Sequence, residues 1–92
     1  MKIIIAGAGQ VGFELARVLS THHDVTVIDK DVEALERIHE LIDIFPVAGD
    51  IENPDTYRAL HETEADIFVA VTDSDEVNLL STLIINDTIN VK

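Results

Sequence analysis

Three glycines and one aspartate are the residues whose spacing predicts ligand chemistry. Gly7, Gly9 and Gly12 follow a short apolar run, and Asp29 stands twenty residues after Gly9. In such a turn the first glycine permits a tight bend, the second lets the backbone approach a pyrophosphate, and the third lets a helix pack closely on the strand. The amides and positive dipole end of that helix attract phosphate. The pattern therefore predicts a nucleotide site.

Asp29 is expected to select the ligand, because it ends the second apolar run. A carboxylate there accepts hydrogen bonds from both ribose hydroxyls and repels a 2′-phosphate. We therefore expect NAD, or a nucleotide such as ATP or ADP, in preference to NADP. The adjacent Lys30 would soften this exclusion of a 2′-phosphate, although an arginine would hold such a phosphate better than a lysine. The alternative interpretation is that Asp29 only caps a turn.

Composition and charge exclude several classes of function. The 92 residues are enough for one domain, and the 18 acidic against 6 basic residues give a net charge of -12. Such a field repels nucleic acid and anionic lipid, so we expect neither as a partner. The chain has no cysteine, which agrees with an intracellular setting. The N-terminal apolar run is too short for a signal peptide or a membrane span, so we expect a soluble protein.

The elements that must position the glycines and Asp29 alternate along the chain. Apolar runs and helical periodicity predict the order βαβαβαβα, which is typical of a parallel sheet with helices on both faces. We expect an α/β fold, a Rossmann-like doubly wound sheet of about four strands in the order 3-2-1-4. Pro46 places the third strand at an edge. The expected strands are 3–6, 25–28, 44–48 and 66–71, and the expected helices are 10–21, 32–42, 54–60 and 73–86.

Local signals within these helices give further expectations. Asp31 and Asn53 are expected caps, with Pro54 at the first helical position. Asp73, with Glu76 three residues later, has the form of a capping box. The buried faces are expected to hold Val11, Leu15, Val18 and Leu19 in the first helix and Val32, Leu35, Ile38 and Ile42 in the second.

Histidines and acids outside the glycine turn are expected to be structural. Adjacent His22 and His23 fit a solvated helix end better than a metal site, and histidine complements the helix dipole there. Asp73, Asp75 and Glu76 are expected to stabilise the start of a helix rather than to bind a divalent cation together with a nucleotide phosphate. We therefore expect no metal site and no catalytic residue. His39 and His61 are expected to be exposed helix residues.

The C-terminal residues 88–92 have the composition of a strand that has just begun. We therefore expect residues 1–92 to form a single domain, truncated at its C-terminus. The fourth strand would then lie near an edge. Its run from Ile67 to Val71 carries no charge to protect it from pairing with another chain. Either a partner covers this strand or the domain is marginally stable.

Several runs together resemble the TrkA-N domain, also called KTN or the RCK N-lobe, of Trk-type potassium-uptake regulators. The resemblance covers nearly the whole chain, and its most specific part is the run Val71-Thr72-Asp73-Ser74-Asp75-Glu76-Val77-Asn78-Leu79. The other matching runs are 4–12, 27–29, 49–50, 65–66 and 69–70.

The resemblance implies a cytosolic regulatory domain and not an enzyme. Such domains bind NAD(H) or ATP/ADP, form dimers or octameric rings, and gate a membrane potassium channel or transporter. Many ATP-preferring relatives have arginine where this chain has Gln10, which favours NAD(H) or a diphosphate. By position, the implied phosphate loop is Gly7, Ala8, Gly9, Gln10, Val11 and Gly12, the ribose site is Asp29 and Lys30, the adenine site is Gly49, Asp50 and Ile51, and Thr72 closes the pocket.

Two other functions are compatible with the glycine turn. One is the excised cofactor domain of an NAD-dependent oxidoreductase, which would need a catalytic domain elsewhere. A short-chain reductase needs a lysine four residues after its tyrosine, and Tyr57 is followed at that offset by His61. The other is a minimal Rossmann-like scaffold that folds without a signalling role.

Overall fold

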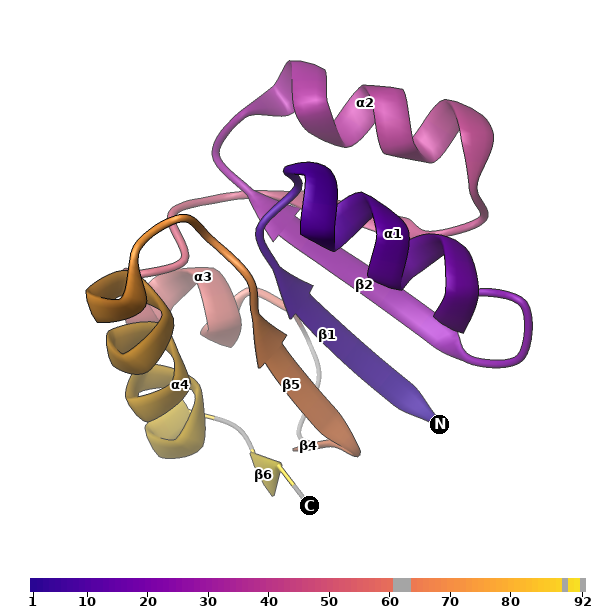
Figure 1. Ribbon diagram of the computed structural model, residues 1–92. Coiled ribbons are helices and arrows are strands. Elements are labelled where there is room, and N and C mark those ends of the chain that lie inside the picture. The colour runs from indigo at the N-terminus through magenta and orange to yellow at the C-terminus, as the bar shows by residue number, and fades with distance from the viewer. Residues whose placement is uncertain (61–63, 89, 92) are drawn as a thin grey trace.

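A four-stranded parallel sheet forms the centre of the protein, in the order β3-β2-β1-β5. The structure is a computed structural model that describes residues 1–60, 64–88 and 90–91. The expected Rossmann-like class and strand order are confirmed (Figure 1). Its strands are β1 (Lys2–Ala6), β2 (Asp24–Asp29), β3 (Phe45–Ala48) and β5 (Ile67–Ala70), and its helices are α1 (Gln10–Leu19), α2 (Val32–Leu41), α3 (Pro54–Arg58) and α4 (Asp75–Thr88).

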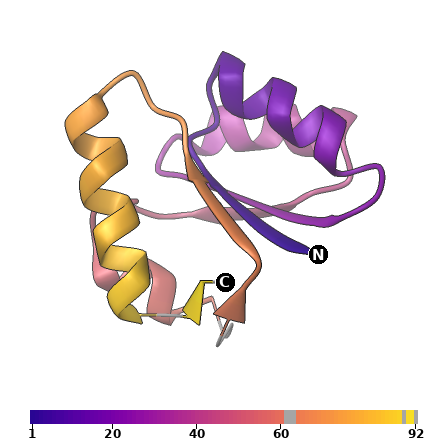
Figure 2. The same cartoon turned by 60° about the horizontal axis from the view of Figure 1, so that its bottom comes forward.

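Helices cover both faces of the sheet. Neighbouring residues of a strand point to opposite faces, so apolar residues along β1 and β2 supply a core on each side. Figure 2 shows α1 and α2 on one face and α3 with α4 on the other. Ile5 and Val27 belong to the core beneath α1 and α2, whereas Ile4 and Ile28 belong to the core that contains Tyr57 and Ile85. The short loops at the carboxyl ends of the strands are therefore left to form a site.

The expected buried faces of the first two helices need a correction. Val11 and Val18 are 57% and 61% exposed, and Val32 is 50% exposed. In α1 the buried residues are Gly12 and Ala16. Small residues let the helix approach β1 closely, so they turn inward and the valines turn outward. Leu15, Leu19, Leu35, Ile38 and Ile42 pack against the core as expected.

The start of α4 also differs from the expectation. The helix begins at Asp75, and its cap is Ser74, whose Oγ accepts a hydrogen bond from the Val77 amide at 3.2 Å. Asp73 therefore lies outside the helix and forms no capping box with Glu76. The other two expected caps are confirmed, since the Asp31 and Asn53 side chains accept from backbone amides of α2 and α3.

Among the described C-terminal residues, 90 and 91 do not extend the main sheet. Residue 88 still belongs to α4, and β6 (Asn90–Val91) pairs in parallel with β4 (Glu64–Ala65) in a separate two-stranded sheet. A strand thus does begin within residues 88–92, as expected, but it lies outside the main sheet. β3, with Pro46, and β5 are the two edges of the main sheet. Within the described ranges, no helix is long and apolar enough to cross a membrane.

Candidate functional site

The glycine turn between β1 and α1 has the geometry that its sequence predicts. Gly7 has a φ of +122°, a conformation that side chains disfavour, and its amide bonds the Ile28 carbonyl at 2.8 Å. A Cβ on Gly12 would lie 2.1 Å from the Gly7 oxygen, so only glycine permits this close packing. A Cβ on Gly9 would meet no atom within 4 Å. The backbone at Gly9 is thus open to an approaching group.

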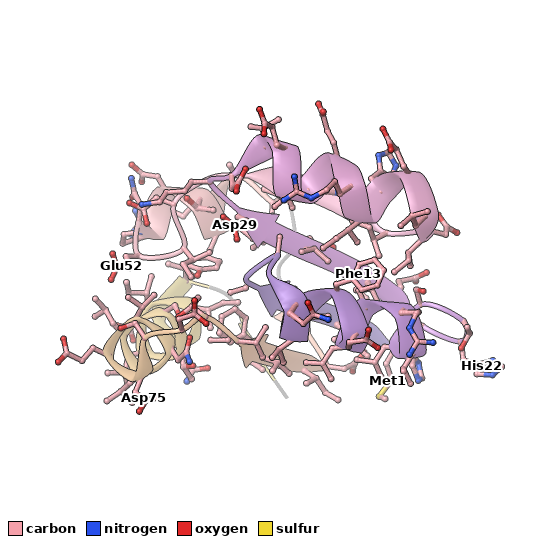
Figure 3. All side chains as sticks on the ribbon, turned by 45° about the horizontal axis from the view of Figure 1, so that its top comes forward. Met1, Phe13, His22, Asp29, Glu52 and Asp75 are labelled. Atoms are coloured by element: carbon pink, nitrogen blue, oxygen red, sulfur yellow. The ribbon has the colours of Figure 1, made fainter. Side chains whose placement is uncertain are left out.

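Asp29 is hydrogen-bonded to the glycine turn. Its Oδ2 accepts from the Ala8 amide at 2.8 Å and its Oδ1 from the Asp31 amide at 2.9 Å. The carboxylate therefore does cap a turn, and it also fixes the position of the loop next to it. Each carboxylate oxygen has more than one acceptor site, so both remain able to accept from a ribose hydroxyl. Figure 3 shows Asp29 at the end of β2.

A pocket of about 390 Å³ lies at the carboxyl ends of the strands. We call it the strand-end pocket. It is formed by the end of β2, the loop after β3, the loop between β5 and α4, and Val77 of α4. It lies beside the point where the strand order reverses between β1 and β5, which is where ligands bind in such sheets. Its lining residues are Asp29, Lys30, Asp50, Ile51, Glu52, Thr72, Asp73, Ser74 and Val77.

The strand-end pocket brings together residues that the sequence places far apart. Asp29 and Lys30, Asp50 and Ile51, and Thr72 were each expected at the site, and all five line it. Its charged lining consists of four acids and one lysine. Such a lining repels phosphate and suits groups that donate hydrogen bonds, such as ribose hydroxyls and an adenine amino group.

Thr72 is fixed in the pocket wall by Asn78. Asn78 Oδ1 accepts from the Thr72 amide at 2.9 Å and from Thr72 Oγ1 at 2.6 Å, and its Nδ2 donates to the Thr72 carbonyl at 3.2 Å. The Asn78 side chain thereby bonds both the N–H and the C=O of Thr72, as the backbone of a neighbouring strand would. Asn78 was not expected as a site residue, although it lies within the most specific run of the sequence.

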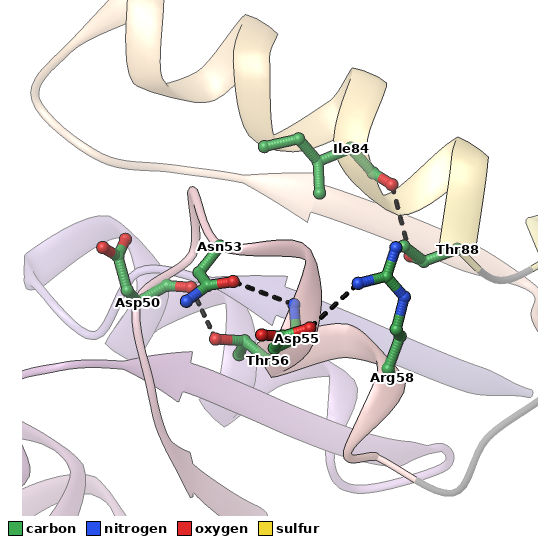
Figure 4. A network of polar contacts seen from close by, with 7 residues as sticks. All are labelled: Asp50, Asn53, Asp55, Thr56, Arg58, Ile84 and Thr88. Atoms are coloured by element: carbon green, nitrogen blue, oxygen red, sulfur yellow. Dashed lines mark hydrogen bonds and ion pairs between the residues drawn. The ribbon is translucent and has the colours of Figure 1, made fainter.

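The loop after β3 is held by the start of α3 (Figure 4). Thr56 Oγ1 donates to the Asp50 carbonyl at 2.7 Å, and a Cβ on Gly49 would lie 2.8 Å from Thr56 Cγ2. The buried Tyr57 hydroxyl donates to the Ile51 carbonyl. Burial raises the pKa of the Tyr57 phenol, and the charge of Asp50 acts in the same direction. Hydrogen bonds from Thr56 and Tyr57 of α3 thus hold the loop that carries Asp50 and Ile51.

A second pocket, of about 310 Å³, lies between α1 and α2. We call it the helix groove, and Figure 3 shows Phe13 between the two helices. Three residues of the expected phosphate loop, Ala8, Gly9 and Gln10, line it. Of the expected site residues, Gly7, Val11, Gly12 and Gly49 line neither pocket. The other residues of the helix groove are Phe13, Ala34, Arg37, Ile38 and Leu41.

The histidines and acids provide no metal centre in the part of the chain that is described. There, no three His, Asp or Glu side chains are grouped as metal ligands. His22 and His39 are exposed, whereas His23 is half-buried with Nδ1 3.4 Å from the N-terminal amine. His61 lies outside the described residues.

Comparison with known sequences identifies a family. The TrkA-N domain matches residues 3–92. The Trk system potassium uptake protein TrkA homolog of Archaeoglobus fulgidus is 49% identical over 83 residues, which cover 90% of this chain and 19% of that protein. TrkA of Halomonas elongata is 45% identical over 82 residues, which cover 88% of this chain and 18% of that protein. The chain thus spans about a fifth of the length of these relatives.

Comparison with solved structures supports the fold alone, because the sequence identities are low. An L-sorbose reductase from Gluconobacter frateurii, complexed with NADPH and L-sorbose, has a TM-score of 0.72 and 17% identity and covers 96% of this chain and 45% of its own. An actinorhodin polyketide ketoreductase with NADPH has a TM-score of 0.75 and 16% identity, with 95% and 45% covered. The family match spans nearly the whole chain and agrees with the glycine turn and with the run that contains Thr72 and Asn78: this chain belongs to the TrkA-N domain family.

Proposed function

We propose that residues 1–92 form a regulatory nucleotide-binding domain of a potassium transport system. The observation that carries this proposal is the strand-end pocket, where Asp29, Asp50, Ile51 and Thr72 meet beside the glycine turn. The ligand is NAD(H) or an adenine nucleotide such as ADP or ATP, with NAD(H) favoured. Its adenosine lies in the strand-end pocket and its phosphates lie over Gly9.

The charges of the pocket support this choice of ligand. A 2′-phosphate on the ribose would stand close to the Asp29 carboxylate, with Lys30 as the one basic residue in the lining. NADP is therefore disfavoured relative to NAD. Gln10, at the start of α1, is a neutral amide and pairs with a γ-phosphate less well than arginine does. This favours NAD(H) or ADP over ATP.

A sensing role is favoured over catalysis. The similar proteins from Archaeoglobus and Halomonas are named as parts of Trk potassium uptake systems. The Tyr57 hydroxyl is buried and donates to a backbone carbonyl, so it is not available as the acid of a reductase. We propose that the domain acts at the inner face of the membrane, within a dimer or larger ring. There it binds a membrane potassium channel or transporter subunit and alters its activity with the nucleotide.

Isothermal titration calorimetry of the 92-residue chain tests ligand binding. We expect NAD, NADH and ADP to bind in the micromolar range without turnover, ATP to bind more weakly, and NADP to bind most weakly. Each bound nucleotide must also raise the melting temperature, because it binds the folded state. The absence of heat and of a melting shift with all five would contradict the proposal.

The regulatory part needs a separate experiment. Potassium flux into vesicles that carry a Trk membrane subunit would be measured with the domain, with and without NADH. We expect flux to depend on the domain and on the nucleotide together. Oxidation of NADH by the domain with a carbonyl substrate would instead favour the oxidoreductase alternative.

A further inference from the structure

The two pockets meet at one hydrogen bond. Asp29 lines the strand-end pocket, Ala8 lines the helix groove, and the Ala8 amide donates to Asp29 Oδ2 at 2.8 Å. A ligand whose ribose contacts Asp29 therefore has its next groups at the glycine turn, beside the mouth of the helix groove. Gly9 and Gln10 in this groove are exposed.

The electrostatic character of the two pockets is opposite. The strand-end pocket has four acids in its lining, whereas the helix groove has no acid and one guanidinium, that of Arg37. The amino end of α1 adds the partial positive charge of its unpaired amides. In a protein with a net charge of -12, the helix groove is thus the local place where a phosphate is favoured.

Arg37 differs from the two other arginines of the chain. Arg17 pairs with Glu14 at 2.7 Å and Arg58 pairs with Asp55 at 2.9 Å, each three residues earlier in its own helix. Arg37 has Glu33 and Glu40 at helical spacing, where ion pairs commonly form. Within the described part of the chain it makes no hydrogen bond or ion pair with either. Its guanidinium is therefore available to a ligand in the helix groove.

We propose that Arg37 is the residue that selects for phosphate: its guanidinium binds the phosphates of a nucleoside diphosphate, or the pyrophosphate of a dinucleotide, seated on the glycine turn. The inference rests on the proposed function, since the ligand is the same. A guanidinium donates two parallel hydrogen bonds to a phosphate. Arg37 on α2 supplies the positive charge that Gln10 on α1 lacks.

The test is calorimetry at low salt with ADP, AMP and adenosine. The variants are Arg37→Gln, Arg37→Lys and the control Arg17→Gln, which removes the same charge from an arginine outside both pockets. In Arg37→Gln we expect the affinity for ADP to fall about tenfold to a hundredfold, as for the loss of a charge-assisted hydrogen bond. The affinity for adenosine is expected to change less than about twofold, and Arg37→Lys is expected to restore part of the ADP affinity.

The outcomes separate this inference from the proposed function. If the wild type binds ADP and adenosine, and Arg37→Gln changes both equally or neither, the inference is overturned and the proposed function stands. An equal loss in Arg17→Gln would also overturn it, because the effect would then come from net charge. If the wild type binds none of the three, the inference is overturned, and the proposed function falls with it only if NAD and NADH also give no heat and no melting shift. Melting curves of each variant check that the fold is retained.

Discussion

The backbone amide of Ala8 and the carboxylate of Asp29 are joined by a 2.8 Å hydrogen bond that fixes the glycine turn against the end of β2. Ala8 is buried, so its amide depends on this acceptor. The second carboxylate oxygen accepts from the Asp31 amide and orders the approach to α2. One side chain thus positions the loops on which the proposed ribose and phosphate contacts depend, before any ligand is bound.

Replacing Asp29 is expected to affect stability and binding together. In Asp29→Ala the buried Ala8 amide loses its partner, which costs about 1–3 kcal/mol of folding free energy. Nucleotides that carry a ribose should lose about 1–3 kcal/mol of binding free energy, because the hydroxyls lose their acceptor. Urea unfolding and calorimetry measure the two effects.

Asp31→Ala is the matched control for Asp29. It removes the cap that accepts from the Ala34 amide at 3.2 Å, and such caps contribute about 1 kcal/mol. Its stability should fall while nucleotide affinity stays at the wild-type value. Equal losses of affinity in both variants would mean that Asp29 acts only through stability.

The two glycines at positions 9 and 12 are expected to respond oppositely to alanine. Gly12→Ala places a Cβ against the Gly7 oxygen, and overpacking of this kind costs about 1–3 kcal/mol. Gly9→Ala adds its methyl group in open space, so the free energy of unfolding should stay the same or rise slightly. Nucleotide affinity should fall in Gly9→Ala, because the methyl group stands where phosphate approaches. Wild-type ADP affinity in Gly9→Ala would show that no phosphate lies there.

Asn78 is expected to shape the strand-end pocket through Thr72. Asn78→Ala removes two acceptor contacts and one donor contact to Thr72, and the loss of partners for half-buried groups costs about 1–3 kcal/mol. ADP affinity should fall with it. Thr82→Val is the control, since it removes only the bond from Thr82 Oγ1 to the Asn78 carbonyl. Denaturant unfolding and ADP titration of both variants measure the free energy of unfolding and the ADP affinity. Equal losses in Asn78→Ala and Thr82→Val would disprove this role.

Local signals in the sequence were sufficient for much of the fold. β1 and β5 consist of apolar residues apart from Lys2. Asp31 and Asn53 stand directly before apolar-periodic segments, where a side-chain acceptor caps a helix, and both predicted caps are confirmed. Other features depend on tertiary contacts. Val11 and Val18 share helical spacing with Leu15, and only the close contact of Gly12 with the turn decides which side is buried.

The same limit applies to the candidate site. Asp29 is predicted from the glycine motif, and Asp50 and Thr72 are predicted from the resemblance to the TrkA-N domain, but the side chains that hold these residues in place are not predicted by either. Asp73 and Ser74 are adjacent, and either side chain could cap α4. Thr72 Oγ1 bonds the backbone of Ser74, and Ser74 Oγ accepts from the Val77 amide, so Ser74 is the cap. Arg37 resembles any charged residue of an exposed helix in sequence. Its position in the helix groove depends on how α2 packs beside α1, which a periodic pattern does not specify.

Tyr57 is expected to make the domain lose stability at alkaline pH. Because burial and Asp50 raise the pKa of its phenol in the folded state, the protonated form is favoured on folding. The resulting stability is complete below the unfolded pKa of about 10 and is lost as pH rises beyond it toward the folded pKa. Tyr57→Phe has no phenol to ionise. Between about pH 8 and pH 11, a range that spans the unfolded pKa, its stability should therefore fall less than that of the wild type. It should be less stable near neutrality by about 0.5–1.5 kcal/mol, for the lost bond to Ile51. Thermal melts of both proteins across this pH range measure the difference, and any other ionisation is common to the two. Parallel curves of melting temperature against pH would contradict the prediction.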